Sequence, residues 1–357
     1  MHHFSSIRSK LAAYGLDAIM LTEQYNRFYA ADFPSTGTDG LALITRNRNY
    51  YFTDSRYTVA AQRHVKDAVI SITAPGRGYV ELVNEVIENE GIRKLGFDEG
   101  YMTVADFRRY EGALKAELLP ATALMTGLRV VKDEEELERL RHAQRIADKA
   151  LTETVPMIRP GVTEKEVAAY LTYRLLANGA ENVSFDPIVV SGENGAMPHG
   201  VPSEKKIQDG EFVTIDFGAL KDGYCSDTTR TFAVGHVTEE MEKVYNTVLK
   251  AQTTAIAATR AGMTGKEIDG IARKIIADAG YGEYFGHGYG HGVGVQIHEG
   301  PNVNARNDQP MPAGSVTSAE PGIYLPGQFG VRIEDVVILW EDGYEDLTSL
   351  PKELTIL

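Results

Sequence analysis

The chain has 357 residues, 43% of them hydrophobic and 24% charged, which is typical of a globular protein with room for about two domains. Its 36 basic and 50 acidic residues give a net charge of −14, which argues against nucleic acid as the main partner. Cys225 is the only cysteine, so an internal disulfide is impossible, and this suits a reducing compartment such as the cytoplasm.

The N-terminal residues carry no targeting signal that we can identify. Arg8, Lys10 and Asp17 interrupt the first 21 residues before an apolar signal core can form. No run of eighteen apolar residues occurs anywhere in the chain, so we expect no membrane-spanning segment and no membrane partner. The sequence therefore predicts a cytoplasmic protein.

Residues 5–124 alternate short β-rich runs with amphipathic helical stretches. Ser5 or Ser6 is a candidate cap for the first helix, and residues 79–90 form a later helical stretch that ends before Gly91. The β-rich runs are residues 17–21, 40–45, 49–53, 68–72 and 94–99. This alternation predicts an α/β domain with a partly parallel sheet, which we assign to residues 1–125.

A highly charged stretch, residues 132–151, opens the second predicted domain, residues 126–357. Its leucine and isoleucine side chains recur at roughly helical spacing, at Leu137, Leu140, Ile146 and Leu151. Such spacing predicts a long surface helix with one apolar face.

The second domain contains an internal repeat. Residues 159–179 resemble residues 260–280, which lie 101 positions later. Both segments contain a glycine, a threonine suited to cap a helix, Lys-Glu in the first turn, an apolar face and a final glycine. The repeat predicts two related halves about a pseudo-twofold axis.

Two further matches between the halves each align one carboxylate with another. Residues 209–218 match residues 313–322, which places Asp216 over Glu320. A shorter match places Asp227 over Glu334. Weak repeats arise by chance, but the alignment of acid with acid points to a shared site.

These four acids, with an imidazole, suggest a metal centre. An acid on an apolar strand is costly unless it is paired, hydrogen-bonded or bound to a cation, and each acid alone could be an ordinary salt-bridged residue. Residues 286–299 supply three histidines among five glycines: His287, His291 and His298. Two aspartates, two glutamates and one histidine suit two divalent ions about 3.5–4 Å apart.

The motifs in this domain resemble those of the pita-bread metallopeptidases, which include methionine aminopeptidase, aminopeptidase P, prolidase and the metal-free creatinase. They are VTIDFGA, GYCSDTTRTF, GHGYGHGVGVQIHEGP, TSAEPGIY and VRIEDVV. NRFY (residues 26–29) and YFTDSRY (residues 51–57) resemble the aminopeptidase P and prolidase branch. The resemblance implies an α+β fold: a pseudo-twofold pita-bread domain at the C-terminus and a smaller creatinase-like α/β domain at the N-terminus.

The resemblance also assigns roles to individual residues. It implies that His199 and His298 are catalytic histidines that do not bind metal, and that Glu320 carries a proton to the leaving nitrogen. His287 would line the substrate pocket, and Arg332 would either anchor a carboxylate or order the ligands. The implied metal ligands are Asp216, Asp227, His291, Glu320 and Glu334. A donor set rich in carboxylates suits Mn²⁺ first, with Co²⁺, Zn²⁺ or Fe²⁺ as alternatives.

The function implied by the resemblance is cleavage of the bond between an N-terminal residue and a following proline in short peptides. We place an Xaa-Pro aminopeptidase first and an Xaa-Pro dipeptidase (prolidase) second. A peptide-binding or partner-binding module that has lost catalysis is a distant alternative, disfavoured because His199 and His298 accompany the ligands. The family also implies a homodimer.

Overall fold

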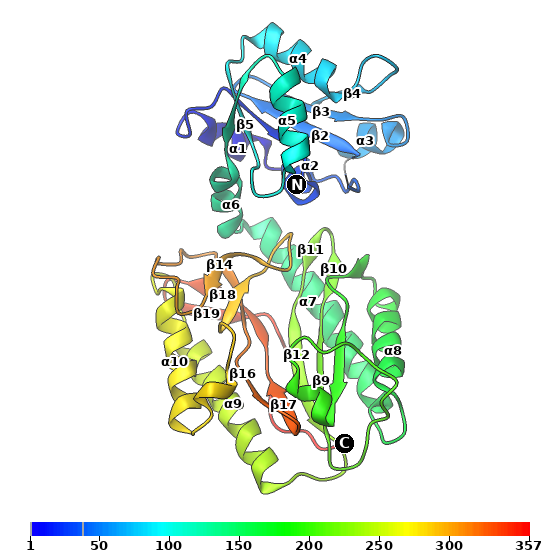
Figure 1. The fold of residues 1–357 in the computed structure, drawn as a ribbon, viewed down its shortest axis with the longest axis vertical. Coiled ribbons are helices and arrows are strands. Elements are labelled where there is room, and N and C mark those ends of the chain that lie inside the picture. The colour runs from blue at the N-terminus through cyan, green and yellow to red at the C-terminus, as the bar shows by residue number, and fades with distance from the viewer. Residues whose placement is uncertain (1, 38) are drawn as a thin grey trace. The chain divides into compact units, whose positions relative to one another are not determined.

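The computed structural model describes residues 2–37 and 39–357. The chain forms two compact units, unit 1 (Met1–Arg129) and unit 2 (Val130–Leu357) (Figure 1). Each unit is described separately below. Among the described residues, no helix combines the length and the apolar composition needed to cross a bilayer.

Unit 1 is built on one mixed sheet with the strand order β4-β3-β2-β1-β5-β6. The pairs β1–β5, β5–β6 and β3–β4 are parallel, whereas β1–β2 and β2–β3 are antiparallel, which confirms a partly parallel sheet. The outer strand β6 was not predicted, because ELLP is only four residues long and ends in proline. The strands are β1 (Ala18–Leu21), β2 (Gly40–Thr45), β3 (Asn49–Thr53), β4 (Val69–Ile72), β5 (Lys94–Phe97) and β6 (Glu117–Pro120).

The helices of unit 1 bury one apolar face against this sheet. Helix α4 matches the predicted residues 79–90, and its Leu82 and Val83 join the core with Leu41 and Leu43 of β2. Helix α1 begins at Phe4 without a side-chain cap, so the prediction of a Ser5 or Ser6 cap was wrong. The helices are α1 (Phe4–Leu11), α2 (Gln24–Ala31), α3 (Thr58–His64), α4 (Tyr79–Glu90), α5 (Val104–Ala113) and α6 (Thr122–Val130).

The first half of unit 2 begins with the predicted long helix, α7 (Glu134–Thr154). Asp133 and Glu136 form a capping box at its start, and Leu137, Leu140 and Leu151 are buried along one face. Helix α8 (Glu164–Ala177) packs with α7 against a sheet of order β12-β9-β8. The strands of this half are β7 (Asn182–Val183), β8 (Ile188–Ser191), β9 (Phe212–Phe217), β10 (Ala219–Lys221), β11 (Tyr224–Cys225) and β12 (Thr228–Ala233).

The second half of unit 2 repeats this plan with α9 (Glu239–Ala258) and α10 (Gly265–Asp278). In Figure 1, α7 and α8 lie along one side of unit 2 and α9 and α10 along the other, with strands between them. The larger sheet has the order β14-β13-β15-β18-β19, and β16 pairs with β17. The strands are β13 (Gly290–Gly292), β14 (Glu299–Val303), β15 (Val316–Ala319), β16 (Gly322–Leu325), β17 (Phe329–Arg332), β18 (Asp335–Trp340) and β19 (Gly343–Asp346).

The sequence repeat corresponds to matching helix starts in the two halves. Thr163 caps α8 and Thr264 caps α10, each within a capping box completed by a glutamate three residues later. Each half also has its own hydrophobic core, one around α7 and α8 and the other around α9 and α10. The predicted arrangement of two related halves with an additional N-terminal α/β unit is confirmed.

Candidate metal centre and substrate pocket

Pairing between strands of the two halves brings the first three acids together. Strand β9 carries Asp216 opposite Thr229 of β12, and the backbone N–H of Glu334 donates to the carbonyl of Thr229 at 3.1 Å. Thr229 also donates its hydroxyl to Glu334 Oε2 at 2.7 Å. Asp227 lies immediately before β12, so it is close to the point where Thr229 contacts Glu334.

Strands β13 and β15 add the histidine and the fourth acid. His291 lies in β13, and its backbone N–H donates to Ser318 Oγ of β15 at 3.1 Å. Glu320 follows β15 directly and accepts a hydrogen bond from the same serine hydroxyl at 3.1 Å. Ser318 therefore orients both residues toward the acids of the first half.

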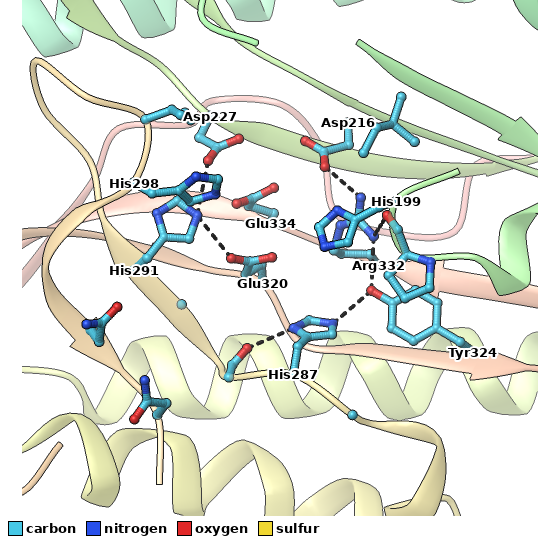
Figure 2. Close-up of a pocket in the computed structure, with 18 of the residues that line it drawn as sticks. His199, Asp216, Asp227, His287, His291, His298, Glu320, Tyr324, Arg332 and Glu334 are labelled. Carbon is cyan, nitrogen blue, oxygen red and sulfur yellow. Dashed lines mark hydrogen bonds and ion pairs between the residues drawn. The ribbon is translucent and has the colours of Figure 1, made fainter. Parts of the chain in front are cut away.

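The resulting cluster has spacing suited to a cation. Asp227, His291 and Glu334 each offer one ligand-type atom, and these atoms all lie within 4.8 Å of one another. His291 Nε2 is 3.5 Å from Asp227 Oδ2 and 3.3 Å from Glu320 Oε1 (Figure 2). Its Nδ1 is 3.1 Å from the carbonyl oxygen of Gly292, a contact that leaves Nε2 to face the carboxylates.

The electrostatics of the carboxylates also fit a cation. Burial and the neighbouring charge of Asp216 raise the pKa of Asp227 well above its usual value. Burial and the charge of Asp227 do the same to the pKa of Glu334. Asp216 Oδ1 is buried without a hydrogen-bond partner. A divalent cation would offset this repulsion and supply a partner for that oxygen, so the residues fit the predicted metal centre.

His291 and Glu320 interact directly, with Nε2 of the imidazole 3.3 Å from Oε1 of the carboxylate. Burial acts to raise the pKa of Glu320, but the hydrogen bond from His291 and the positive charges of His291, His287 and Arg332 together lower that pKa to about 2. Burial acts to lower the pKa of His291, but Glu320, Asp227 and the carbonyl of Gly292 together raise it to about 9. Each group therefore favours the charged form of the other.

A chain of hydrogen bonds leads from Asp216 to His287 on the other side of the pocket (Figure 2). Arg332 Nη2 donates to Asp216 Oδ2 at 2.6 Å, and Arg332 Nη1 donates to the hydroxyl of Tyr324 at 3.0 Å. That hydroxyl lies 2.9 Å from His287 Nε2, while His287 Nδ1 lies 2.8 Å from the carbonyl oxygen of Gly288. Since a carbonyl can only accept, Nδ1 carries the proton and Nε2 accepts from Tyr324.

The surroundings of Arg332 bear on the two roles that the sequence left open. Its side chain is buried and also donates from Nε to Thr229 Oγ1 and from Nη1 to the carbonyl oxygen of Pro198. Together with the bonds to Asp216 and Tyr324, four of its five N–H donors are engaged. This geometry favours ordering of the ligands over anchoring of a substrate carboxylate.

The cluster lies in a cavity of about 800 Å³, within the range of small-molecule sites. His199 reaches it from the loop after β8, and the His298 ring lies 4.3 Å from that of His291, centroid to centroid. Burial and the neighbouring His291 lower the pKa of His298, which favours a neutral imidazole. All nine residues that the sequence singled out line this cavity: His199, Asp216, Asp227, His287, His291, His298, Glu320, Arg332 and Glu334.

Some residues of the site were missed by the sequence analysis. Thr229 and Tyr324 connect the acids to Arg332 and His287, and Phe185 and Ile188 form part of the apolar wall. Thr229 and Tyr324 were within the quoted motifs GYCSDTTRTF and TSAEPGIY. Hydroxyl side chains are common in strands, however, and the sequence alone does not show which of them hydrogen-bond to residues of a site.

The fold and the site together define a metallopeptidase. The model of metallopeptidase family M24 matches residues 138–341, and that of the creatinase/prolidase N-terminal domain matches residues 4–131. The chain belongs to metallopeptidase family M24. The predicted class of enzyme, the family branch and the fold are thereby confirmed.

Relatives with named activities cover nearly the whole chain. An Xaa-Pro dipeptidase from Pyrococcus furiosus is 37% identical over 343 residues, which are 95% of each chain. The structure of an Xaa-Pro dipeptidase from Bacillus anthracis is 42% identical, with a TM-score of 0.94 over 99% of each chain. An X-Pro aminopeptidase from Thermotoga maritima is 37% identical, with a TM-score of 0.93 over 100% of each chain.

Proposed function

We propose that this protein is a metal-dependent Xaa-Pro dipeptidase, which hydrolyses the bond between an N-terminal residue and a C-terminal proline. The observation that carries the proposal is the cavity lined by the acids, His291 and three further histidines, in a chain 42% identical over 99% of its length to an Xaa-Pro dipeptidase. This reverses the order of our sequence-based interpretation, in which the aminopeptidase came first.

Five side chains would hold two divalent ions: Asp216, Asp227, His291, Glu320 and Glu334. Bound divalent ions supply hydroxide near neutral pH and polarise a carbonyl oxygen. Mn²⁺ remains our first choice because four of the five ligands are carboxylates. The acidic surroundings would also attract the substrate's N-terminal ammonium.

The remaining polar residues act on the substrate. His199 and His298 donate hydrogen bonds to the oxygen of the scissile carbonyl as negative charge develops on it. Glu320 takes a proton from the attacking water and passes it to the nitrogen of proline, which must be protonated to leave as a secondary amine. Both imidazoles line the cavity without belonging to the closely spaced group formed by Asp227, His291 and Glu334.

The proline ring suits this site for a simple chemical reason. An Xaa-Pro bond has no N–H, so a protease that depends on that donor cannot bind it. His287 has both ring nitrogens engaged by Tyr324 and Gly288, so it offers the proline a ring surface rather than a hydrogen bond. With Tyr324 it forms a wall against which a pyrrolidine can pack.

A second candidate is an Xaa-Pro aminopeptidase that accepts longer peptides. It is favoured by the likeness to the X-Pro aminopeptidase from Thermotoga maritima, which is 37% identical. The two activities share the chemistry described above and differ only in whether the chain beyond proline is accepted. We further propose a cytoplasmic homodimer, on the grounds of the single cysteine and of the family.

A comparison of three peptides tests the proposal. With Mn²⁺ present, we expect kcat/KM to be highest for the dipeptide Ala-Pro, clearly lower for Ala-Pro-Ala and lowest for Ala-Ala. The chain beyond proline is the only difference between the first two peptides, and the pyrrolidine is the only difference between the first and the third. Preference for the tripeptide would replace the dipeptidase by the aminopeptidase, and preference for Ala-Ala would contradict the proline specificity itself.

A further inference from the structure

A buried carboxylate outside the metal centre holds the loop that carries His199. Glu164 is the first residue of α8, and its side chain is fully buried. Its Oε1 accepts hydrogen bonds from the backbone N–H and the hydroxyl of Ser191, at 2.6 and 2.9 Å. Its Oε2 accepts from the backbone N–H and the hydroxyl of Ser203, at 3.1 and 2.6 Å. Asn194 Nδ2 is 3.1 Å from Oε1.

These contacts hold both ends of one segment. Ser191 ends β8 and Ser203 precedes the return to β9, so the intervening loop is closed at its base by a single side chain. Asn194, in the first turn of this loop, donates a hydrogen bond to the same carboxylate. His199 lies on this loop and reaches the cavity, although no contact joins it directly to Glu164.

Five hydrogen-bond donors surround the Glu164 carboxylate. Every contact on Glu164 comes from an N–H or O–H group, and charge-assisted hydrogen bonds of this kind are stronger than neutral ones. A neutral amide in the same place would turn two N–H groups toward these donors. The loop would then lose contacts and gain repulsion without any change in side-chain size.

The second half of unit 2 has no carboxylate at the position equivalent to Glu164. The position 101 residues after Glu164 is Gly265, the first residue of α10. A Cβ atom there would lie 2.4 Å from the carbonyl oxygen of Asn302, so the backbone after His298 packs directly on the helix start. Glu164 is therefore not a general feature of the repeated helix, but is specific to the half that carries His199.

We propose that Glu164 is a positioning residue for His199: it acts on catalysis by fixing the loop that presents this imidazole to the cavity. The proposal rests on the catalytic role given to His199 under the proposed function. Arg332 donates a hydrogen bond to the carbonyl oxygen of Pro198, next to His199, at 3.3 Å. This contact does not depend on Glu164, so it should still hold the loop against β17 when Glu164 is replaced by a neutral residue. The expected effect is misplacement of the imidazole and not loss of the fold.

The test is a double-mutant cycle of Glu164→Gln with His199→Ala, with Ala-Pro as substrate and Mn²⁺ present. We expect Glu164→Gln alone to lower kcat by about 10- to 100-fold, the usual scale for removing a residue that orients a functional group. The bound metal should stay at two ions per chain. In the His199→Ala background the same change should lower kcat less than about threefold, because no imidazole remains to be positioned.

Glu166→Gln is the matched control, since Glu166 lies on the same first turn of α8 but is exposed and caps the helix. It should leave kcat within about twofold. If Glu164→Gln does not fold, Ser203→Ala removes one hydroxyl contact and is expected to show the same dependence on His199.

The outcomes separate the two proposals. Unchanged activity in His199→Ala alone would refute the catalytic role of His199, and with it this inference. A large loss in His199→Ala combined with wild-type kcat in Glu164→Gln would overturn the inference alone. So would equal losses from Glu164→Gln in both backgrounds, because these would show a general effect on the fold.

Discussion

Replacement of Asp227 by asparagine is expected to release most of the bound metal and to abolish turnover. The residue is 4% exposed, and one of its carboxylate oxygens lies within 4.8 Å of ligand-type atoms of His291 and Glu334. Asparagine keeps the shape and removes the charge that a divalent ion requires. We expect a loss in kcat/KM greater than the roughly 10- to 100-fold typical of residues that only support a ligand. Metal analysis and hydrolysis of Ala-Pro measure the two effects.

The same substitution should not destabilise the metal-free protein. Burial and neighbouring negative charges raise the pKa of Asp227, so folding of the metal-free protein disfavours its charged form. Asparagine has no charge to bury, so the melting temperature of metal-free Asp227→Asn should equal or exceed that of the metal-free wild type. This separates loss of metal from loss of fold.

Cys225→Ser is the control for this experiment because Cys225 is also buried and lies two residues before Asp227. Its thiol contacts the carbonyl oxygen of Val295 at 3.8 Å, a contact that a hydroxyl can replace. Activity should stay within a few-fold of the wild type. Full activity in Asp227→Asn depleted of metal would refute the metal centre.

Removal of either histidine proposed to be catalytic should separate chemistry from metal binding. His298→Ala and His199→Ala are each expected to lower kcat by about 10²- to 10⁴-fold, the scale for removing a proton or oxyanion partner. Both variants should retain two metal ions per chain, because both imidazoles lie outside the closely spaced cluster. Steady-state kinetics and metal analysis of the purified variants check both statements.

His236→Ala is the matched control, since His236 is exposed, pairs with Asp209 and does not line the cavity. It should leave both kcat and metal content unchanged. Loss of metal in His298→Ala or His199→Ala would mean that the residue is a ligand and that the ligand set is misassigned.

The sequence predicted the architecture of unit 2 because its halves repeat. Aligning Asp216 with Glu320 and Asp227 with Glu334 required only counting along the chain, and the structure brings all four into one cavity. The helix caps Thr163 and Thr264 were equally accessible, since capping depends on neighbouring residues only.

Contacts between distant segments could not be predicted in this way. Glu164 looked like part of a helix start, yet its carboxylate binds residues 27 and 39 positions away. Arg332 is similar: the sequence allowed it to bind substrate or ligands, and only the positions of Asp216 and Tyr324 favour one role. Phe4 shows the same limit in unit 1, where its burial, and not a serine cap, accompanies the start of α1.

Titration of metal-free protein with Mn²⁺ tests the central claim most directly. Chelator-treated protein should have no measurable activity on Ala-Pro, and activity should return in proportion to bound Mn²⁺ until two ions are bound per chain. Asp227→Asn titrated in parallel should bind less Mn²⁺ and recover no activity. Hydrolysis of Ala-Pro by the metal-free wild type at the rate of the Mn²⁺-loaded enzyme would contradict the account.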